Sequence, residues 1–199
     1  GLESELDAKV VIQVIEAHMA VLGSLTTPGT DVPLALLDMG GGSTDAAYVG
    51  SDGTVDSIHL AGAGDLVTML IDSELGLDDR DLAEQIKKHP VAKVETLFSI
   101  RHENGTVSFR DEPIDSNAFG RVVLLGDDDT LEPIPADVSV ENVRTVRRAA
   151  KEKVFVRNAE RALRLITPAG NVRHLPFVVM VGRSALDFEI PELVSDALA

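Results

Sequence analysis

The sequence predicts an α/β fold, and three features carry that prediction. An apolar run at residues 34–37 ends in a glycine-rich turn and is followed at once by an alternating segment at residues 46–49, which is typical of two strands joined by a tight loop. Residues 140–167 show the periodicity of a long helix, and a second apolar run at residues 177–181 leads to Gly182. The expected order is helix, three-stranded meander, helix, long helix, strand and helix, an α/β layout in which two glycine junctions can converge at one cleft.

The composition restricts the class of protein. The 199 residues include 44% hydrophobic side chains, which is enough for a substantial core and argues against disorder. A formal net charge of −15 disfavours nucleic acids and anionic membranes as partners. The absence of cysteine excludes disulfides and thiolate metal sites and is compatible with a reducing cytosol, so we expect a cytoplasmic protein. No apolar run approaches the roughly 18 residues of a membrane span.

Residues 4–23 are predicted to form the first helix. Ser4 is a candidate N-cap, with an acidic first turn after it. Apolar residues recur with helical spacing at Val10, Val11, Val14, Ile15, Met19 and Leu22. Residues 26–30 contain a Pro-Gly pair and separate this helix from the first strand.

The turn after the first strand is the candidate site, and it reads Asp38-Met39-Gly40-Gly41-Gly42-Ser43-Thr44-Asp45. Three successive glycines place no Cβ atom in the turn, so backbone amides can converge on an anion at close range. Ser43 and Thr44 add hydroxyl donors, while Asp38 and Asp45 offer oxygen ligands to a hydrated divalent cation. The turn joins two strands rather than opening a helix, so it is not the usual phosphate loop. A flexible hairpin tip with incidental acids is the alternative.

Turn and cap signals divide the middle of the chain into short elements. Residues 54–60 are expected as a third strand, and residues 66–75 as a buried helix whose glycine-rich start permits close packing or a second anion site. Residues 78–81 open a short helix that ends at Pro90. Residues 94–110 contain two alternating runs around an Asn-Gly hairpin signal, which leaves His102 and Glu103 in solvent at the tip. Residues 121–125 are expected as a strand, and the acid run at residues 127–129 as an exposed turn.

The long predicted helix combines an apolar stripe with a cluster of bases. The stripe comprises Phe155, Ala159, Ala162, Leu163 and Ile166. The helix also holds eight of the 18 basic residues, namely Arg144, Arg147, Arg148, Lys151, Lys153, Arg157, Arg161 and Arg164. These bases face a nucleotide, an acidic patch of a partner or the acids of their own domain, and the sequence leaves the three alternatives open.

The end of the chain supplies the second glycine junction. Residues 168–171 end the long helix, and residues 177–181 are predicted to form a fully buried strand. That strand leads through Gly182-Arg183-Ser184 to a terminal helix. Such an edge allows a backbone to lie against a flat ring or a sugar.

Two motifs in this order resemble the second half of an actin-like ATPase with a ribonuclease H fold, as in sugar kinases and heat-shock chaperones. Asp-Met-Gly-Gly-Gly-Ser-Thr-Asp at residues 38–45 is similar to the second phosphate motif of that superfamily, and Val-Gly-Arg-Ser-Ala at residues 181–185 to its adenosine motif. Longer runs at residues 59–64, 83–90, 93–105, 150–156 and 186–191 are similar to the large subunit of diol/glycerol dehydratase reactivase. The resemblance covers nearly the whole chain.

The resemblance implies one actin-like half-domain across residues 1–199. Its sheet would combine the three-stranded antiparallel meander with a parallel strand, and helices would cover both faces. Residues 33–76 and 138–199 would form the core. Residues 77–137 would form an inserted region with a helix and a β-hairpin.

The resemblance also implies a chaperone-like reactivating factor for an adenosylcobalamin-dependent diol or glycerol dehydratase. In that family, ATP hydrolysis and nucleotide exchange switch the affinity for the inactivated dehydratase, and damaged cobalamin is released. The implied cofactors are ATP or ADP and Mg²⁺. The implied partners are a small reactivase subunit and the dehydratase, with no nucleic acid and no membrane.

The resemblance assigns roles to residues by position. The residues that would hold phosphate oxygens are Gly40, Gly41, Gly42, Ser43 and Thr44. Asp38 would hold Mg²⁺ through water or orient the attacking water, with Asp45 as a second carboxylate beside the metal. The adenosine would be lined by Gly182, Arg183 and Ser184. Glu152 and Lys153 would touch ribose or adenine, because related ATPases use an acid and a base on a helix.

Two departures from the family pattern affect the site. The first phosphate motif belongs to the amino-terminal half of the family and is not found in this chain, so we expect this chain alone to bind ATP weakly or not at all and to hydrolyse it negligibly. Arg183 stands where a second glycine is usual, and its guanidinium either blocks the base or stacks on it.

Two other classes of function remain open. A small-molecule kinase shares the superfold, although no substrate base is apparent outside the phosphate motif. A nucleotide-independent interaction module would keep the glycine turn only as architecture. The basic helix in an acidic chain is compatible with that module.

Overall fold

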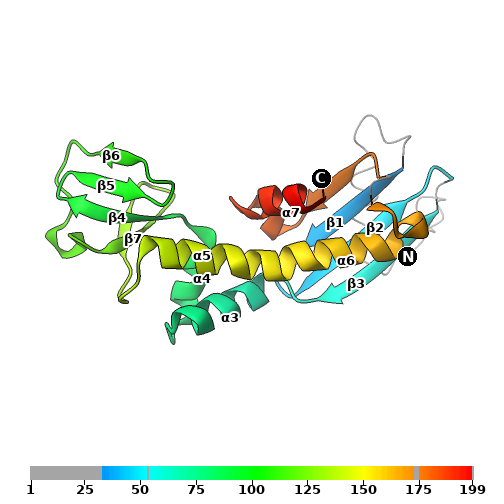
Figure 1. The fold of residues 1–199 in the computed structure, drawn as a ribbon, viewed down its shortest axis with the longest axis horizontal. Coiled ribbons are helices and arrows are strands. Elements are labelled where there is room, and N and C mark those ends of the chain that lie inside the picture. Colours follow the sequence, from blue (N-terminus) through cyan, green and yellow to red (C-terminus); the bar gives the residue numbers. More distant parts are fainter. Residues whose placement is uncertain (1–32, 53, 173–174, 199) are drawn as a thin grey trace, which may run out of the picture.

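The computed structural model describes residues 33–52, 54–172 and 175–198. Two β-sheets lie at opposite ends of the molecule, and one long helix runs from the first to the second (Figure 1). We call the four-stranded sheet sheet A and the five-stranded sheet sheet B. The helix expected over residues 4–23 lies outside the described residues.

Sheet A confirms the predicted meander and the parallel strand. Its strands are β1 (Leu34–Met39), β2 (Ser43–Val49), β3 (Val55–Ala61) and β9 (Val178–Val181), in the order β3-β2-β1-β9. β1 pairs antiparallel with β2 and parallel with β9. The prediction that β9 is fully buried is wrong, because all four of its residues are only half-buried and Phe177 before it is 58% exposed. β9 lies at the edge of the sheet, where it has a neighbouring strand on one side alone.

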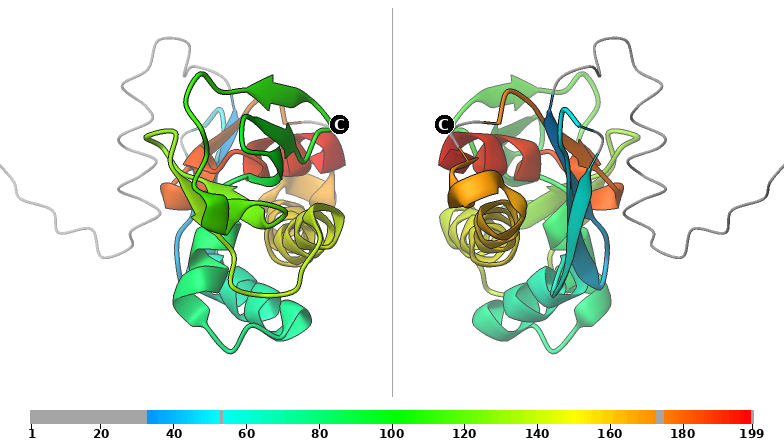
Figure 2. Two further views of the ribbon diagram at one scale, coloured as in Figure 1. Left: turned by 90° about the vertical axis from the view of Figure 1, so that its left-hand side faces the viewer. Right: turned by 90° about the vertical axis from the view of Figure 1, so that its right-hand side faces the viewer.

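The described helices are α3 (Gly64–Leu75), α4 (Arg80–Lys88), α5 (Val140–Lys151), α6 (Arg157–Ile166) and α7 (Ile190–Leu198), and a π-helical turn, η2 (Glu152–Val156), joins α5 to α6. α6 packs against β2 and β3 of sheet A, α5 reaches β4 of sheet B, and α4 packs against α3. Figure 2 shows α6 and α7 on the same side of sheet A. Alternate residues of β1 point into this layer, and Ala35, Leu37 and Met39 are fully buried in one core with the predicted stripe of the long helix. The expectation that helices also cover the other face is not met by the described helices.

Local signals mark where the described helices begin and end. The Asp79 side chain accepts a hydrogen bond from the Leu82 amide at the start of α4, and the Ser139 hydroxyl accepts one from Asn142 at the start of α5. Gly76 ends α3 in the left-handed conformation. Short 3₁₀ turns occupy Ser116–Ala118, Pro168–Gly170 and Arg183–Leu186.

Sheet B is larger than the hairpin that the sequence predicts. Its strands are β4 (Val91–Thr96), β5 (Ser99–His102), β6 (Val107–Phe109), β7 (Val122–Leu125) and β8 (Leu131–Pro133), all antiparallel in the order β6-β5-β4-β7-β8. The Asn-Gly turn joins β5 to β6 as expected. The run before that turn is two strands rather than one, because the Thr96 hydroxyl accepts a hydrogen bond from the Phe98 amide and reverses the chain without glycine or proline.

None of the described helices is long and apolar enough to cross a lipid bilayer. The acid run after β7 is exposed as expected, since the Asp127 side chain is 97% exposed.

Candidate functional site

The glycine loop between β1 and β2 is held from one side through its carbonyl groups. The amides of Gly64, Asp65 and Gly62 donate to the carbonyls of residues 40, 41 and 42 at 3.3, 2.8 and 3.0 Å. Because a peptide unit is planar and trans, the amides of Gly41 and Gly42 point away from that segment. Both glycines are exposed, and neither amide donates to a described residue. The loop therefore presents backbone N–H groups that suit an anion.

The second glycine junction touches the first. The Ser184 hydroxyl donates a hydrogen bond to the Gly40 carbonyl at 3.2 Å. Gly182 has a φ of +88°, and a Cβ atom there would lie 2.6 Å from both Asp38 Oδ1 and the Met39 carbonyl oxygen. Only glycine permits this close approach. The expected convergence of the two junctions is thus present in the structure.

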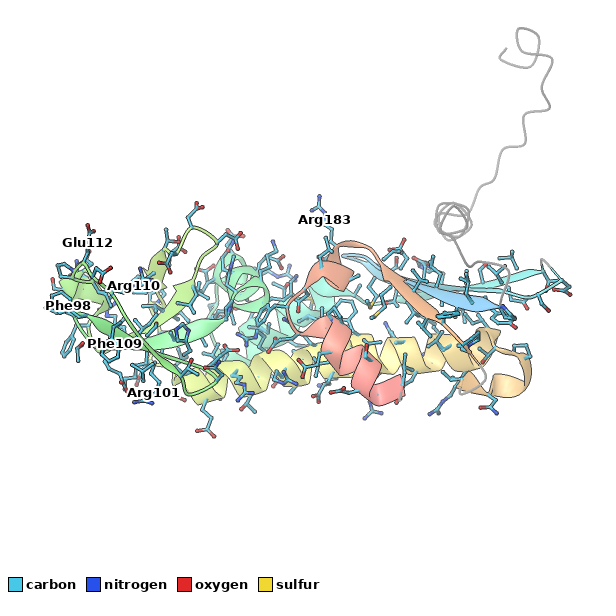
Figure 3. The ribbon with its side chains drawn as sticks, turned by 90° about the horizontal axis from the view of Figure 1, so that it is seen from above. Phe98, Arg101, Phe109, Arg110, Glu112 and Arg183 are labelled. Atoms are coloured by element: carbon cyan, nitrogen blue, oxygen red, sulfur yellow. The ribbon has the colours of Figure 1, made fainter. Side chains whose placement is uncertain are left out.

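A cavity of about 740 Å³ opens where the junctions meet. The glycine loop, the start of α3, the end of α4 and the segment after β9 all contribute to its wall. Among its lining residues are Gly40, Gly41, Gly64, Lys87, Lys88, Arg183, Ser184 and Phe188. Arg183 stands at the rim, and Figure 3 shows its side chain projecting away from the ribbon.

An acid and two bases reach this cavity from α4. Glu84, Lys87 and Lys88 all line it, and Lys87 Nζ donates to the Gly64 carbonyl at 3.1 Å and to Thr68 Oγ1 at 2.9 Å. Sequence reasoning missed these residues. The available signal was an acid followed by bases three and four residues later on a short helix. The acid–base role was assigned instead to Glu152 and Lys153 of the long helix.

The structure does not bring Glu152 and Lys153 to this cavity. Both line a separate groove between the long helix and α7. Phe155 of the same π turn does line the cavity. Glu152 and Lys153 therefore belong to the other face of the helix.

The two candidate metal ligands lie side by side on sheet A. Asp38 and Asp45 are register partners across β1 and β2, so their side chains share one face of the sheet. Asp45 also contacts His59 Nδ1 at 2.6 Å and accepts a hydrogen bond from Ser43 Oγ at 3.0 Å. Hard carboxylate oxygens fit Mg²⁺, which takes one or two of them and keeps several waters. The described residues form no cluster of three or more acids or histidines suited to a metal.

The hydroxyl of Thr44 has a structural partner. The side chain is fully buried and donates to the Gly62 carbonyl at 3.1 Å, which holds the segment before α3 against the loop. Asn158 of α6 donates to the same carbonyl at 2.7 Å. Of the predicted site residues, Gly40, Gly41, Arg183 and Ser184 line the cavity. The others, namely Asp38, Gly42, Ser43, Thr44, Asp45, Glu152, Lys153 and Gly182, are not among its lining residues.

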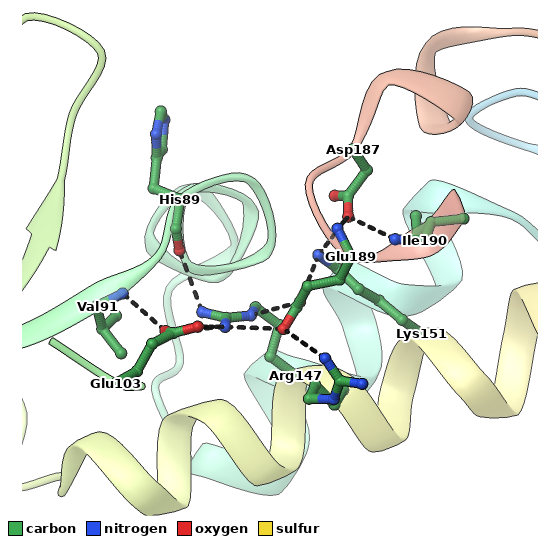
Figure 4. Close-up of polar contacts among 9 residues, drawn as sticks. His89, Val91, Glu103, Arg147, Lys151, Asp187, Glu189 and Ile190 are labelled. Atoms are coloured by element: carbon green, nitrogen blue, oxygen red, sulfur yellow. Dashed lines mark hydrogen bonds and ion pairs between the residues drawn. The ribbon is translucent and has the colours of Figure 1, made fainter. Parts of the chain in front are cut away.

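A buried charge network forms one side of the site (Figure 4). The Arg147 guanidinium donates to Glu189 at 2.8 Å, to Glu103 at 2.7 Å and to the His89 carbonyl at 3.2 Å. Lys151 Nζ donates to Asp187 at 2.7 Å and to Glu189 at 2.8 Å. The side chains of Arg147 and Lys151 are completely buried.

An aromatic ring completes this network at the cavity wall. The Phe188 ring centroid lies 4.8 Å from the Arg147 guanidinium and 4.4 Å from Lys151 Nζ, within the range of cation–π contacts. Phe188 and its neighbour Asp187 both line the cavity. The charge network is therefore continuous with the site.

The position of Glu103 corrects the sequence prediction. We expected a solvated side chain at the hairpin tip, but only 14% of it is exposed. Its carboxylate accepts hydrogen bonds from Arg147 and from the Val91 amide. The hairpin tip folds back onto the start of α5, which local patterns do not reveal.

The charges of the network support one another. Burial by itself would lower the pKa of Arg147, but its contacts with Glu189 and Glu103 outweigh that effect and raise it. Burial would raise the pKa of Glu189, but Arg147 and Lys151 lower it. Arg147 and Glu189 therefore stabilise each other's charged form in the folded protein.

Solved structures place the fold in a class. MreB5 of Spiroplasma citri bound to AMPPNP aligns with a TM-score of 0.53 at 22% identity, over 97% of this chain and 54% of that one. A PilM–PilN type IV pilus biogenesis complex gives the same TM-score at 15% identity, over 95% of this chain and 40% of that one. Identities this low show the fold alone, and that fold is the one found in actin-like ATPases.

Sequence comparison gives the family. The family described as the diol dehydratase reactivase ATPase-like domain matches residues 1–199, and the chain belongs to it. It is 56% identical over 198 residues to the propanediol dehydratase-reactivating factor large subunit of Salmonella typhimurium and to the diol dehydratase-reactivating factor large subunit of Klebsiella michiganensis. The match covers all of this chain and 32% of each relative, so the chain spans about a third of their length.

Solved relatives agree in structure as well as in sequence. A glycerol dehydratase reactivase aligns with a TM-score of 0.87 at 54% identity. A diol dehydratase-reactivating factor in nucleotide-free form aligns with a TM-score of 0.85 at 56% identity. Each alignment covers 99% of this chain and 32% of the other.

Replacing Gly182 with alanine tests the contact between the junctions. The added Cβ would clash with Asp38 and Met39, so we expect Gly182→Ala to lower the free energy of unfolding by about 1–3 kcal/mol more than Gly105→Ala. Gly105 has nearly the same φ, +86°, with no atom near its Cβ position, so the comparison separates the clash from the backbone preference. Urea unfolding of the three proteins measures the difference, and equal losses would contradict the close approach.

Replacing Arg147 with methionine tests the buried network. The change leaves Glu103 and Glu189 buried without their main partner, so we expect a loss of about 3–5 kcal/mol in the free energy of unfolding. Arg144→Met removes an exposed base from the same helix and should change it by less than about 0.5 kcal/mol. Urea unfolding at pH 7 distinguishes them, and a similar small effect of both would show that the network contributes little.

The acid–base contacts of α4 predict a pH dependence. Burial would raise the pKa of Glu84, but hydrogen bonds from Lys87, Lys88 and Thr68 outweigh this and lower it from 4.5 to about 2. A lowered pKa stabilises the fold above pH 4.5, and the stabilisation is lost as the pH falls from 4.5 towards 2. Glu84→Gln should therefore be less stable than the parent at pH 7, and the gap should shrink across this window.

Thermal unfolding between pH 7 and pH 2.5 measures that gap. Because Glu84 is partly exposed, we expect a modest difference of about 1 kcal/mol or less at pH 7. Glu74→Gln is the matched control, since Glu74 is exposed on α3 and has no ion pair with another described residue. A gap that stays constant with pH would refute the assigned pKa.

Proposed function

We propose that the chain is the ATPase-like part of a dehydratase reactivase and binds ATP or ADP with Mg²⁺ at the meeting point of its two glycine junctions. The observation that carries this proposal is the contact of Gly182 and Ser184 with the glycine loop beside a single cavity. Phosphate and nucleoside must be held a fixed distance apart, which requires two rigidly joined binding edges. The family assignment and the actin-like fold agree with this use.

The residues of the chain divide the nucleotide between them in this proposal. The exposed amides of Gly41 and Gly42 bind phosphate oxygens, because the loop carbonyls are already engaged on the opposite side. Ser43 and Thr44 keep the loop in place through their hydrogen bonds to Asp45 and Gly62. Asp38 and Asp45 supply carboxylate oxygens to the hydrated Mg²⁺, which neutralises charge on the phosphates when it is bound. Asp38 also orients the attacking water.

The nucleoside lies towards the second junction and α4. Gly182 and Ser184 give it a flat edge, and Arg183 at the rim stacks its guanidinium on the base. Glu84 and Lys88 of α4 fill the role first expected of Glu152 and Lys153, since they line the same cavity as the glycine loop.

Reactivation follows from a change in nucleotide state. Large subunits of the relatives are named for reactivating propanediol or diol dehydratase. We propose that the full-length protein acts with a small subunit on an adenosylcobalamin-dependent dehydratase in the cytoplasm and releases damaged cobalamin. The nucleotide state selects a conformation, and the different affinities of the two conformations for the dehydratase perform the release.

Calorimetry with MgADP tests whether α4 or the long helix supplies the base that contacts the nucleotide. In the full-length protein, we expect Lys88→Ala to weaken MgADP binding at least about fivefold, because Lys88 lines the proposed site and is about half exposed, so its loss does not disturb the core. Lys153→Ala removes the same type of side chain from the other groove and should leave the affinity unchanged. If Lys153→Ala weakened MgADP binding and Lys88→Ala did not, Lys153 would be the residue that contacts the nucleotide.

The same measurement on this chain alone tests the incomplete site. We expect binding to be weak or undetectable, and a micromolar affinity for MgADP would contradict that expectation.

Asp38→Ala in the full-length protein should abolish rescue of the dehydratase. Intact rescue by this variant would favour an interaction module that does not use nucleotide.

A further inference from the structure

A second groove lies on the opposite side of the long helix from the nucleotide cavity. It has a volume of about 1360 Å³ and is bounded by α5, η2 and α6 on one side and by α7 on the other (Figure 3). Its basic lining residues are Arg148, Lys153, Arg157, Arg161 and Arg164. Val156 lines this groove whereas its neighbour Phe155 lines the nucleotide cavity, so the two sites use different faces of one helix.

The bases of this groove differ from the buried bases of the same helix. Lys153, Arg157, Arg161 and Arg164 are exposed, and none forms an ion pair with another described residue. Arg148 is half-buried and lies 3.8 Å from Glu189. The whole chain has 33 acids and 18 bases, so a groove with five bases and the three acids Glu152, Glu160 and Asp196 departs from the surrounding surface. Such a local reversal of charge favours an acidic ligand.

The bases of this groove follow one another along the long helix. Arg148 belongs to α5, and Lys153 lies five residues later in the π-helical turn. Arg157, Arg161 and Arg164 continue the row at helical spacings of four, four and three residues. The resulting row is about 24 Å long, and π turns of this kind are frequent at functional sites.

The groove also has an apolar floor. Leu193 and Val156 lie within it, and Leu165 at its end is 60% exposed. An inorganic polyanion or a nucleic acid backbone would use the bases alone and leave this apolar surface in water. An amphipathic helix of about 16 residues matches the length of the row. Such a helix would bury its apolar face and extend its acids to the rim.

We propose that this groove binds an acidic amphipathic helix of a partner protein. The bases steer and orient the partner helix, and Leu165, Val156 and Leu193 receive its apolar face. The proposal does not depend on nucleotide binding, because no residue of the basic row lines the nucleotide cavity.

A synthetic helix tests the proposal on the full-length protein. The probe is a fluorescein-labelled peptide of about 18 residues, with leucines on one helical face and glutamates on the other. We expect micromolar binding that weakens as the salt concentration rises. Arg157→Glu with Arg161→Glu should weaken it at least tenfold, or about 1.4 kcal/mol. Leu165→Asp should also weaken it, since it removes the exposed part of the floor.

The control variant is Lys93→Glu with Arg121→Glu. Both bases are exposed; Lys93 lies on β4 and Arg121 directly precedes β7, so the variant has the same change in net charge away from the groove. Its affinity for the peptide should match that of the parent. Circular dichroism of every variant verifies the fold, and MgADP binding should be unchanged in all of them.

Four outcomes would overturn the proposal. The peptide does not bind, or it binds the groove variant as tightly as the parent. A third outcome concerns a peptide of the same composition without an apolar face, or a 20-nucleotide single strand. If either binds as tightly as the probe and its binding is abolished in the groove variant, the groove is a general polyanion site. Sedimentation shows that the groove variant alone changes the oligomeric state, which would assign the groove to a second copy of the chain.

Discussion

The buried charges around Arg147 fix how the parts of this molecule fit together. One guanidinium binds the hairpin tip of sheet B through Glu103, the end of α4 through the His89 carbonyl, and the segment after the second glycine junction through Glu189. Charges inside a protein are costly unless each has a well-placed partner. Here the partners come from three separate segments, so the network joins those segments directly to α5. It does so next to the cavity, because Phe188 contacts both the network and the cavity.

Close contact between backbones explains the glycine at position 182. The loop after β1 turns its carbonyls towards α3, and its amides are left on the outer side. The junction after β9 must then approach Asp38 more closely than any Cβ atom permits. The glycine at position 182 follows from this contact, which brings the two junctions together beside the cavity. An anion site made of backbone N–H groups benefits from this rigidity, since donors that already point at the anion need no rearrangement when it binds.

The long helix separates two kinds of basic residue. Arg147 and Lys151 are buried among acids of the same chain, where they hold the fold together. Lys153, Arg157, Arg161 and Arg164 face outward, and none of them forms an ion pair with another described residue. The sequence left a nucleotide, a partner and the domain's own acids as alternatives. The structure divides the cluster, with the domain's own acids as the answer for the buried pair and an acidic partner as our proposal for the exposed row.

Much of the local structure followed from the sequence alone. Alternation and turn residues predicted the three strands of the meander, and caps and periodicity predicted α3 to α7. The two glycine junctions resemble those of the actin-like fold, and the longer runs at residues 59–64, 83–90, 93–105, 150–156 and 186–191 resemble the reactivase family. Short-range patterns carry this information because helix and strand periods, caps and tight turns depend on neighbouring residues. Signals of this kind placed the glycine loop and the Asn-Gly hairpin correctly.

Contacts between distant segments decided the rest. The reversal at Thr96 rests on a hydroxyl rather than on glycine or proline, the burial of Glu103 on an arginine 44 residues away, and the partial exposure of β9 on its place at the edge of a sheet. The acid and bases at the cavity belong to α4. The sequence did not identify them, because only the tertiary fold shows which helix face meets the glycine loop. A residue's partners across the fold depend on how whole helices and strands pack. The sequence pattern of a single segment does not determine that packing.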